Sequence, residues 1–75
     1  MKHAHLATSP RLQRLLKVLR EADGELSTMD LITRAALVAP STAVSELREN
    51  GCEISCRCEA QPNGSRRYFY QLRKG

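Results

Sequence analysis

Cysteine and histidine are the residue types in this chain best suited to nucleophilic or metal chemistry. Its two histidines, His3 and His5, lie in a short polar stretch at the start, outside any segment with a helical or strand pattern. Nucleophilic catalysis needs a base within hydrogen-bonding reach of the nucleophile, and no such pairing is recognisable. The acids are scattered and no glycine-rich phosphate loop occurs. We therefore expect no enzymatic activity, no bound cofactor and no small-molecule substrate.

The spacing of Cys52, Cys56 and Cys58 favours a structural role over a metal site. A structural zinc site usually takes four ligands in two close pairs, whereas this chain has three cysteines in all. Together with Ile54 they alternate with polar residues, as one face of a strand requires. Buried free cysteine behaves as a small hydrophobic residue. The sequence predicts reduced, metal-free thiols, with Cys56 and Cys58 largely buried.

Basic side chains are concentrated at the two ends of the chain. Residues 1–20 contain five basic residues and no acid, residues 51–75 contain five basic residues and two acids, and residues 21–50 are acidic. The net charge is +4. Basic segments of this kind favour a polyanionic partner, most often nucleic acid. The alternative is ordinary solubilising charge, and the net charge alone does not decide between the two.

The first half of the chain predicts a polar arm followed by a long helix. Residues 1–8 show no apolar period and are expected to form a flexible arm ahead of a single domain over 9–73. Ser9-Pro10 is a strong helix start, because Ser caps free amides and Pro suits the first helical position. Leucines then recur on one helical face up to a stop at Gly24. The expected helix covers about 10–22.

Two shorter helices are expected in the middle of the chain. Ser27 and Asp30 form a capping box for a helix over about 28–37, after a strand of one or two residues. A proline then interrupts the pattern, and a further helix covers about 41–49. Its expected cap is Ser41 or Thr42. Two short helices joined by a short break are typical of a helix-turn-helix arrangement.

After Gly51 the apolar period changes from helical to two, which predicts a β-hairpin. Pro62-Asn63-Gly64 suits a three-residue turn, with Gly in the left-handed position. A two-residue Asn-Gly turn would set the apolar stripe of one strand against the polar stripe of the other. The expected cross-strand pairs are Cys58 with Tyr68, Cys56 with Tyr70, and Ile54 with Leu72.

Three surfaces of this arrangement could contact duplex DNA. The third helix would present its N-terminal residues to the major groove, the hairpin would act as a wing, and the first helix would add phosphate contacts. The expected DNA-binding residues are Ser41, Thr42, Ser45 and Arg48 on the third helix, Asn63, Arg66 and Arg67 on the wing, and Lys2, Arg11 and Arg14 near the start. The alternative for each surface is a solvated polar face, and Glu46 and Glu49 would repel phosphate.

The segment from Ser41 to Ile54 resembles the helix-to-strand signature of small winged helix-turn-helix domains of bacteria, phages and prophages. In those domains a helix reading Ser-Glu-Leu-Arg, as in residues 45–48, precedes a glycine and a strand. Residues 62–72 resemble their wing and closing strand, so the match covers about 10–72. The resemblance implies an α+β fold in the order helix, strand, helix, helix, strand, strand. It also implies a double-stranded DNA-binding protein, either a transcriptional regulator or a phage or prophage accessory factor.

Other functions stay open at this point. A winged helix can instead dock to a host or phage protein or to a second copy of itself, because fold does not settle function. A metal- or redox-responsive regulator using its cysteines is a weaker possibility. No apolar run approaches the roughly 20 residues that span a bilayer, and the start lacks the apolar stretch of a signal peptide. We expect a cytoplasmic protein without a membrane partner, associated with the nucleoid when bound to DNA.

Overall fold

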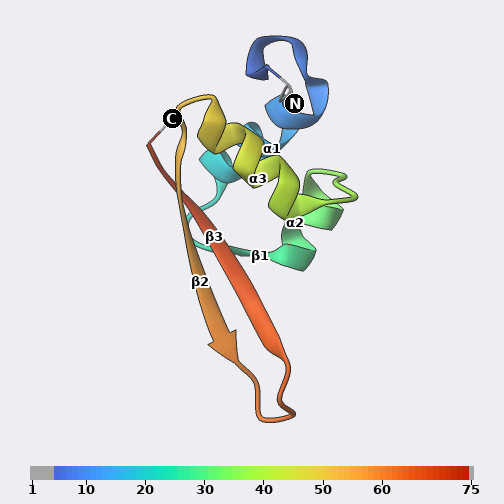
Figure 1. Cartoon of the computed structure of the whole chain (residues 1–75), viewed down its shortest axis with the longest axis vertical. Helices are drawn as coiled ribbons and strands as arrows, with labels where there is room; N and C mark the ends of the chain where they lie inside the picture. Colours follow the sequence, from blue (N-terminus) through green and yellow to red (C-terminus); the bar gives the residue numbers. More distant parts are fainter. Residues whose placement is uncertain (1–4, 75) are drawn as a thin grey trace.

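Three helices pack together at one end of the molecule, and a long hairpin projects from them along the 41 Å axis (Figure 1). The structure, a computed structural model, describes residues 5–74. In chain order the elements are η1 (Leu6–Thr8), α1 (Pro10–Glu21), β1 (Leu26–Ser27), α2 (Thr28–Arg34), α3 (Pro40–Glu49), β2 (Glu53–Ala60) and β3 (Arg66–Lys74). The fold is therefore α+β, with three α-helices and a three-stranded antiparallel sheet.

The 3-10 helix η1 is an addition to the expected order of elements. Residues 6–8 were expected to belong to a loose arm, yet Leu6 packs partly buried against the core. The Leu6 amide donates to Oδ1 of Asn50 at 3.0 Å, and Nε2 of Gln13 donates to the Leu6 carbonyl at 3.0 Å. A single leucine has no periodic partner, so the sequence pattern gave no sign of this contact. Residues 1–4 of the expected arm lie outside the described part of the chain.

The first two α-helices begin where their capping signals predict. Oγ of Ser9 accepts the Leu12 amide at 3.3 Å, and Pro10 occupies the first helical position of α1. At the start of α2, Oγ of Ser27 accepts the Asp30 amide at 3.1 Å, and the Asp30 carboxylate accepts the Ser27 amide at 3.0 Å. This reciprocal capping box confirms the expected start of the second helix.

The break between α2 and α3 differs in detail from the expectation. α2 ends at Arg34 rather than near residue 37, because Ala36 takes a left-handed φ of 54° that a helix cannot continue through. α3 begins at Pro40 with Ala39 as its cap residue, and no side chain caps it. The expected cap at Ser41 or Thr42 is wrong. Both residues lie inside the first turn, because Pro40 takes the first helical position.

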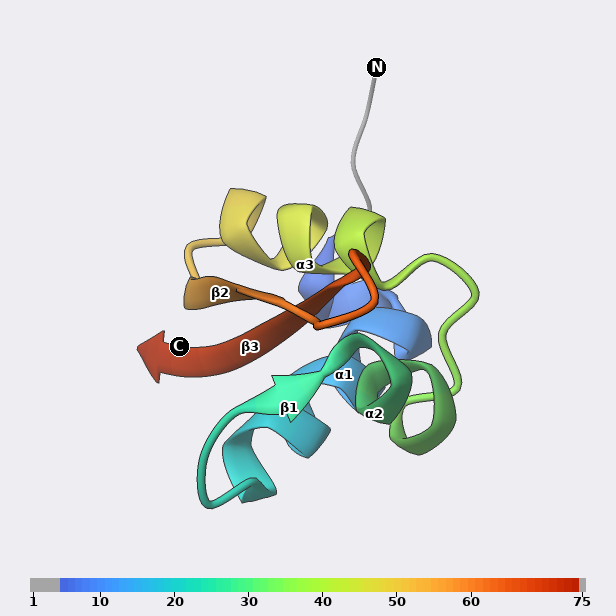
Figure 2. The same cartoon turned by 90° about the horizontal axis from the view of Figure 1, so that it is seen from below.

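The hairpin has the predicted turn and the predicted register. Cys58 pairs with Tyr68, Cys56 with Tyr70 and Ile54 with Leu72. The loop over 62–64 is closed by a 2.8 Å hydrogen bond from the Gln61 amide to the Ser65 carbonyl, and Gly64 has a φ of 87° that glycine adopts without strain. β1 pairs with the other edge of β3, giving the strand order β1-β3-β2. Viewed from below, α3 and β1 lie on opposite sides of the hairpin (Figure 2).

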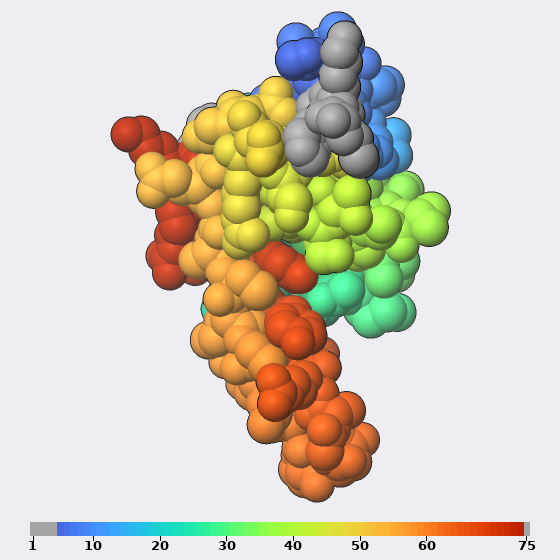
Figure 3. Space-filling model, viewed as in Figure 1, coloured from blue at the N-terminus to red at the C-terminus, as the bar shows by residue number. Residues whose placement is uncertain are grey.

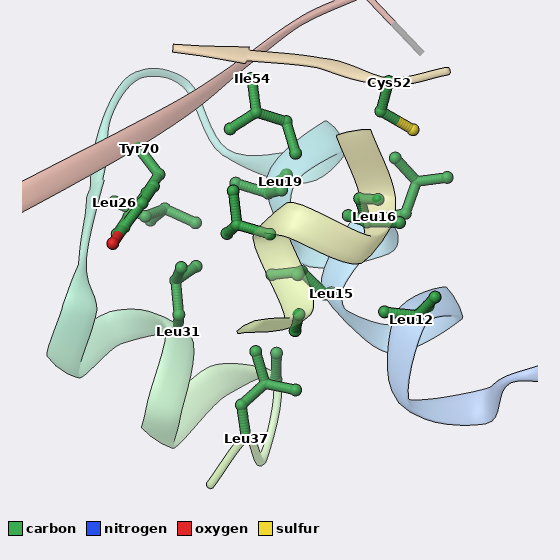
Figure 4. Close-up of a cluster of buried hydrophobic side chains, with 14 residues drawn as sticks. Leu12, Leu15, Leu16, Leu19, Leu26, Leu31, Leu37, Cys52, Ile54 and Tyr70 are labelled. Carbon is green, nitrogen blue, oxygen red and sulfur yellow. The ribbon is translucent and has the colours of Figure 1, made fainter. Parts of the chain in front are cut away.

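The hydrophobic core lies between the three helices and the nearest part of the hairpin (Figure 4). From the hairpin strands only Ile54 and Tyr70 are buried in it. The helices, the loops and β1 supply its other buried side chains, which are Leu12, Leu15, Leu16, Leu19, Leu26, Leu31, Ala35, Leu37, Ala43, Val44, Leu47 and Cys52.

The predicted burial of Cys56 and Cys58 is wrong, because both are exposed. The alternating stripe of β2 continues past the end of the helical body, where no helix covers it. The space-filling view shows this distal part of the hairpin standing clear of the body (Figure 3).

Candidate nucleic-acid interface

The hairpin has two faces of different chemistry. The inner face is the one that carries Ile54 and Tyr70 into the core, and the outer face is its opposite. By alternation along the paired strands, the inner face holds Ile54, Cys56, Cys58, Ala60, Arg66, Tyr68, Tyr70 and Leu72. Between residues 54 and 72 of this pairing, Arg66 is the sole charged side chain of the inner face.

Arg57 on the outer face is the centre of two ion pairs. The Arg57 guanidinium donates to both carboxylate oxygens of Glu25 at 2.8–3.1 Å and to Oε2 of Glu59 at 2.9 Å. These hydrogen bonds from Arg57 hold the pKa values of the Glu25 and Glu59 carboxyls below their usual range. The guanidinium carbons of Arg57 and Arg67 lie 4.6 and 5.5 Å from the centre of the Phe69 ring. Arg67 is exposed, but its guanidinium rests on the Phe69 ring.

The first half of α3 presents a row of hydroxyls to solvent. Ser41, Thr42 and Ser45 are exposed, whereas Val44 and Leu47 face the core, as the helical period predicts. Hydroxyls can donate to or accept from base edges and phosphate oxygens. This part of the expected site is therefore present on one helical surface.

Arg48 has a different orientation from the one expected. Its Nε and Nη2 both donate to the Ile54 carbonyl, at 3.2 and 2.7 Å. The side chain thus connects the last turn of α3 to β2, and its guanidinium is engaged within the fold rather than extended beside Ser45.

The first-helix arginines expected to contact phosphate also have partners within the fold. Nη2 of Arg11 lies 2.7 Å from Oε1 of Glu46, and Nε of Arg14 donates to the Ala35 carbonyl at the end of α2. The Glu46 carboxylate is therefore turned toward α1, away from the exposed hydroxyls of α3. Lys2 lies outside the described residues.

At the hairpin tip, Asn63 shapes the turn and Arg66 offers a guanidinium to solvent. Oδ1 of Asn63 accepts the amide and the hydroxyl of Ser65, at 3.0 and 2.7 Å, so this side chain shapes the turn. Arg66 is exposed and makes no ion pair or side-chain hydrogen bond within residues 5–74. Among the expected arginines, Arg66 is thus the one whose guanidinium is fully available to a ligand.

A groove of about 420 Å³ separates the start of α3 from the inner face of the hairpin. Thr28, at the start of α2, donates to the Tyr68 carbonyl at 3.5 Å. Burial raises the pKa of Tyr70 above its ordinary value. The groove is lined by Thr28, Pro40, Ser41, Cys56, Tyr68 and Tyr70.

Sequence reasoning placed Tyr68 and Cys56 on one face of the hairpin but assigned that face to the core. The available signal was strand length, because β2 and β3 are longer than a seven-residue α2 or a ten-residue α3 can cover.

Within residues 5–74 no group of three or more His, Cys, Asp or Glu side chains is placed to hold a metal ion. None of the helices in that range has the length and apolar character needed to cross a membrane. Comparisons with protein families, with curated proteins and with solved structures find no match to this chain. Its function is therefore inferred from its own side chains and their arrangement.

Proposed function

We propose that this chain is a double-stranded DNA-binding protein of the winged-helix type. The observation that carries the proposal is the position of α3 beside the base of a projecting hairpin, with exposed hydroxyls on the helix and the available Arg66 on the hairpin. In this arrangement α3 is the recognition helix and the hairpin is the wing. The major groove of B-DNA, about 12 Å wide, admits a helix of this kind.

Two features of α3 suit it to a phosphate-lined groove. Because no side chain caps its start, the amides of the first turn are open to an anion, which the helix dipole also favours. Ser41, Thr42 and Ser45 supply adjustable donors and acceptors on the same surface. Arg66, and with it Arg67, would contact the sugar-phosphate backbone from the wing. We infer that phosphate contacts supply most of the affinity and that the hydroxyls of α3 supply the sequence preference.

The proposal makes the chain a binding protein and not an enzyme. It would act in the cytoplasm as a small regulator or as a phage or prophage accessory factor, by occluding a DNA site or by recruiting a partner to it.

A second candidate, docking to another protein or to a second copy, is favoured by two exposed apolar side chains. Met29 is 62% exposed at the start of α2, and Val38 is 98% exposed in the turn before α3.

Duplex binding at several salt concentrations separates the two candidates. The anisotropy of a labelled random-sequence duplex should rise with protein at about 50 mM salt, and the affinity should fall steeply by about 200 mM. As a control for negative charge alone, a labelled acidic protein tested in place of the duplex should show no such salt-dependent binding. If the folded protein does not bind the duplex at low salt, DNA binding is excluded and protein docking becomes the leading function.

A further inference from the structure

Cys56 and Cys58 are exposed free thiols on the inner face of the hairpin. Cys56 lines the groove beside α3, and Cys58 lies one inner-face position nearer the tip, opposite Tyr68. Cys52, in contrast, is buried, with 6% of its surface exposed. Two of the three thiols are therefore open to reagents in solution, on the surface that the proposed function turns toward DNA.

The hairpin face around these two thiols carries one cation and, between residues 54 and 72, no carboxylate. Arg66, diagonal to Cys58 across the strand pair, is the sole charge on the inner face between residues 54 and 72. Glu25 and Glu59 lie on the outer-face side of the hairpin, where both are bound by Arg57. A positive local charge also attracts a small disulfide that carries carboxylates.

The pair is poorly placed to form a disulfide with itself. Two residues along a strand are separated by about 6.6 Å, near the upper limit for bridged Cα atoms, and their side chains run parallel. Cys52 is buried ahead of β2 and cannot reach either thiol without local unfolding. A mixed disulfide formed at Cys56 or Cys58 would therefore not be displaced by a neighbouring thiol of the chain. It would persist until an external thiol reduces it.

We propose that Cys56 and Cys58 form a modification site for low-molecular-weight disulfides of the glutathione class, and that the adduct prevents duplex binding. The regulatory part rests on the proposed function. The cysteine thiolate attacks one sulfur of the small disulfide, a new S–S bond forms, and the original S–S bond breaks. The second half leaves as a thiolate that takes a proton from water. The attached peptide brings bulk and negative charge between α3 and the wing, where it repels phosphate.

Mass mapping tests the modification site without reference to DNA. The reduced full chain is incubated with glutathione disulfide and digested with trypsin, which cuts after Arg57 and so separates Cys56 from Cys58. We expect adducts on both of these residues. Cys52, located by fragmentation of the peptide over 49–57, should react only after denaturation. If Cys52 reacts as fast as the other two, or if neither exposed thiol reacts, the site is wrong.

Duplex affinity before and after modification tests the regulatory part. The adduct should weaken binding about tenfold or more, because like charges brought together across an interface are strongly unfavourable. Excess reduced thiol should restore binding. The Cys56→Ser/Cys58→Ser variant should bind duplex without responding to the disulfide, and Cys52→Ala should respond as the parent does. An adduct that leaves affinity unchanged overturns the regulation alone. Absence of duplex binding by the reduced protein overturns the proposed function and the regulation together, while the mapping still decides the site.

Discussion

Arg11 and Glu46 form an ion pair that joins α1 to α3, with Nη2 of the arginine 2.7 Å from Oε1 of the glutamate. The glutamate side chain is only 10% exposed, so its charge is directed into the body of the protein. The sequence had suggested that Arg11 contacts phosphate and that Glu46 repels it. Their pairing withdraws both charges from the surface that carries the hydroxyls of α3.

Removing the cation of this pair should destabilise the fold. Arg11→Ala should lower the free energy of unfolding by about 1–3 kcal/mol, because a largely buried carboxylate loses a charged donor. The partial exposure of Arg11 favours the lower end of that range. A urea-unfolding double-mutant cycle with Glu46→Gln should show a coupling of about 0.5–3 kcal/mol. Additive losses would show that the two side chains do not interact in solution.

Acid should weaken the start of α2. The Ser27 amide, followed by its hydroxyl, lowers the pKa of Asp30 below the ordinary value of 3.8. The ionised carboxylate therefore stabilises the folded state fully above that value, and this contribution is lost as the pH falls through it and below. Asp30→Asn should make the loss of stability in acid shallower, as measured by urea unfolding from pH 6 down to about pH 3.

Some acid sensitivity should remain in that variant, because the pKa values of Glu25 and Glu59 are also lowered by Arg57. Asp23→Asn, at an exposed loop position, is the matched control. An equal change in the acid dependence of both variants would exclude the capping box as its source.

The leucine core should respond strongly to truncation. Leu47→Ala, at a fully buried position of α3, and Leu16→Ala on α1 should each lower the free energy of unfolding by about 2–5 kcal/mol. Val38→Ala, at a 98% exposed position, should stay within about 0.5 kcal/mol of the parent. Thermal melts of the two leucine variants that overlay the parent would show that the packing is wrong.

The wing should contribute affinity for any duplex. Arg66→Ala/Arg67→Ala should weaken binding to all sequences. It should also reduce the slope of log affinity against log salt by about 0.9 for each phosphate that the wing no longer neutralises. Arg66→Ala alone should account for most of the effect, because Arg67 rests on Phe69.

Lys17→Ala/Arg73→Ala removes the same charge from exposed positions on α1 and at the far end of β3. Its slope should stay close to that of the parent. Equal effects in both double variants would mean that net charge, and not the wing, drives binding.

Two of the four residues of α3 expected to contact DNA, Ser45 and Arg48, should behave differently on substitution. On a site first selected from a random duplex library, Ser45→Ala should reduce discrimination against other sequences by up to about 1–3 kcal/mol. Arg48→Ala should mainly lower the thermal stability, because it removes two hydrogen bonds to the Ile54 carbonyl. A loss of discrimination in Arg48→Ala at parental stability would show that its guanidinium leaves Ile54 to reach DNA.

Local signals explain what the sequence predicted correctly. Ser9-Pro10 and the Ser27–Asp30 capping box each act within four residues, so they identify helix starts without knowledge of the rest of the fold. The Pro62-Asn63-Gly64 turn determines the hairpin register in the same way, because a shift of one residue would reverse the faces of a strand.

Features that depend on distant parts of the chain could not be predicted. Arg11 and Arg14 bind groups 35 and 21 residues away, so helical spacing alone marked them as free surface cations. The exposure of Cys56 depends on where the helices end relative to the sheet, and strand alternation has no information about that. Of the expected DNA contacts, the hydroxyls of α3 needed only the helical period to be placed at the surface, whereas Arg66 is exposed for the same reason as Cys56.

β1 is two residues long and meets β3 only at Phe69 and Tyr70. Apart from the Thr28 hydrogen bond at Tyr68, the hairpin beyond that junction is held mainly by the pairing of its own two strands. Local opening of the hairpin tip would therefore leave the leucine core intact. Such opening would change the separation between the wing and α3. On a duplex, this separation would respond to local groove width, and hence to the shape of the DNA as well as to its bases.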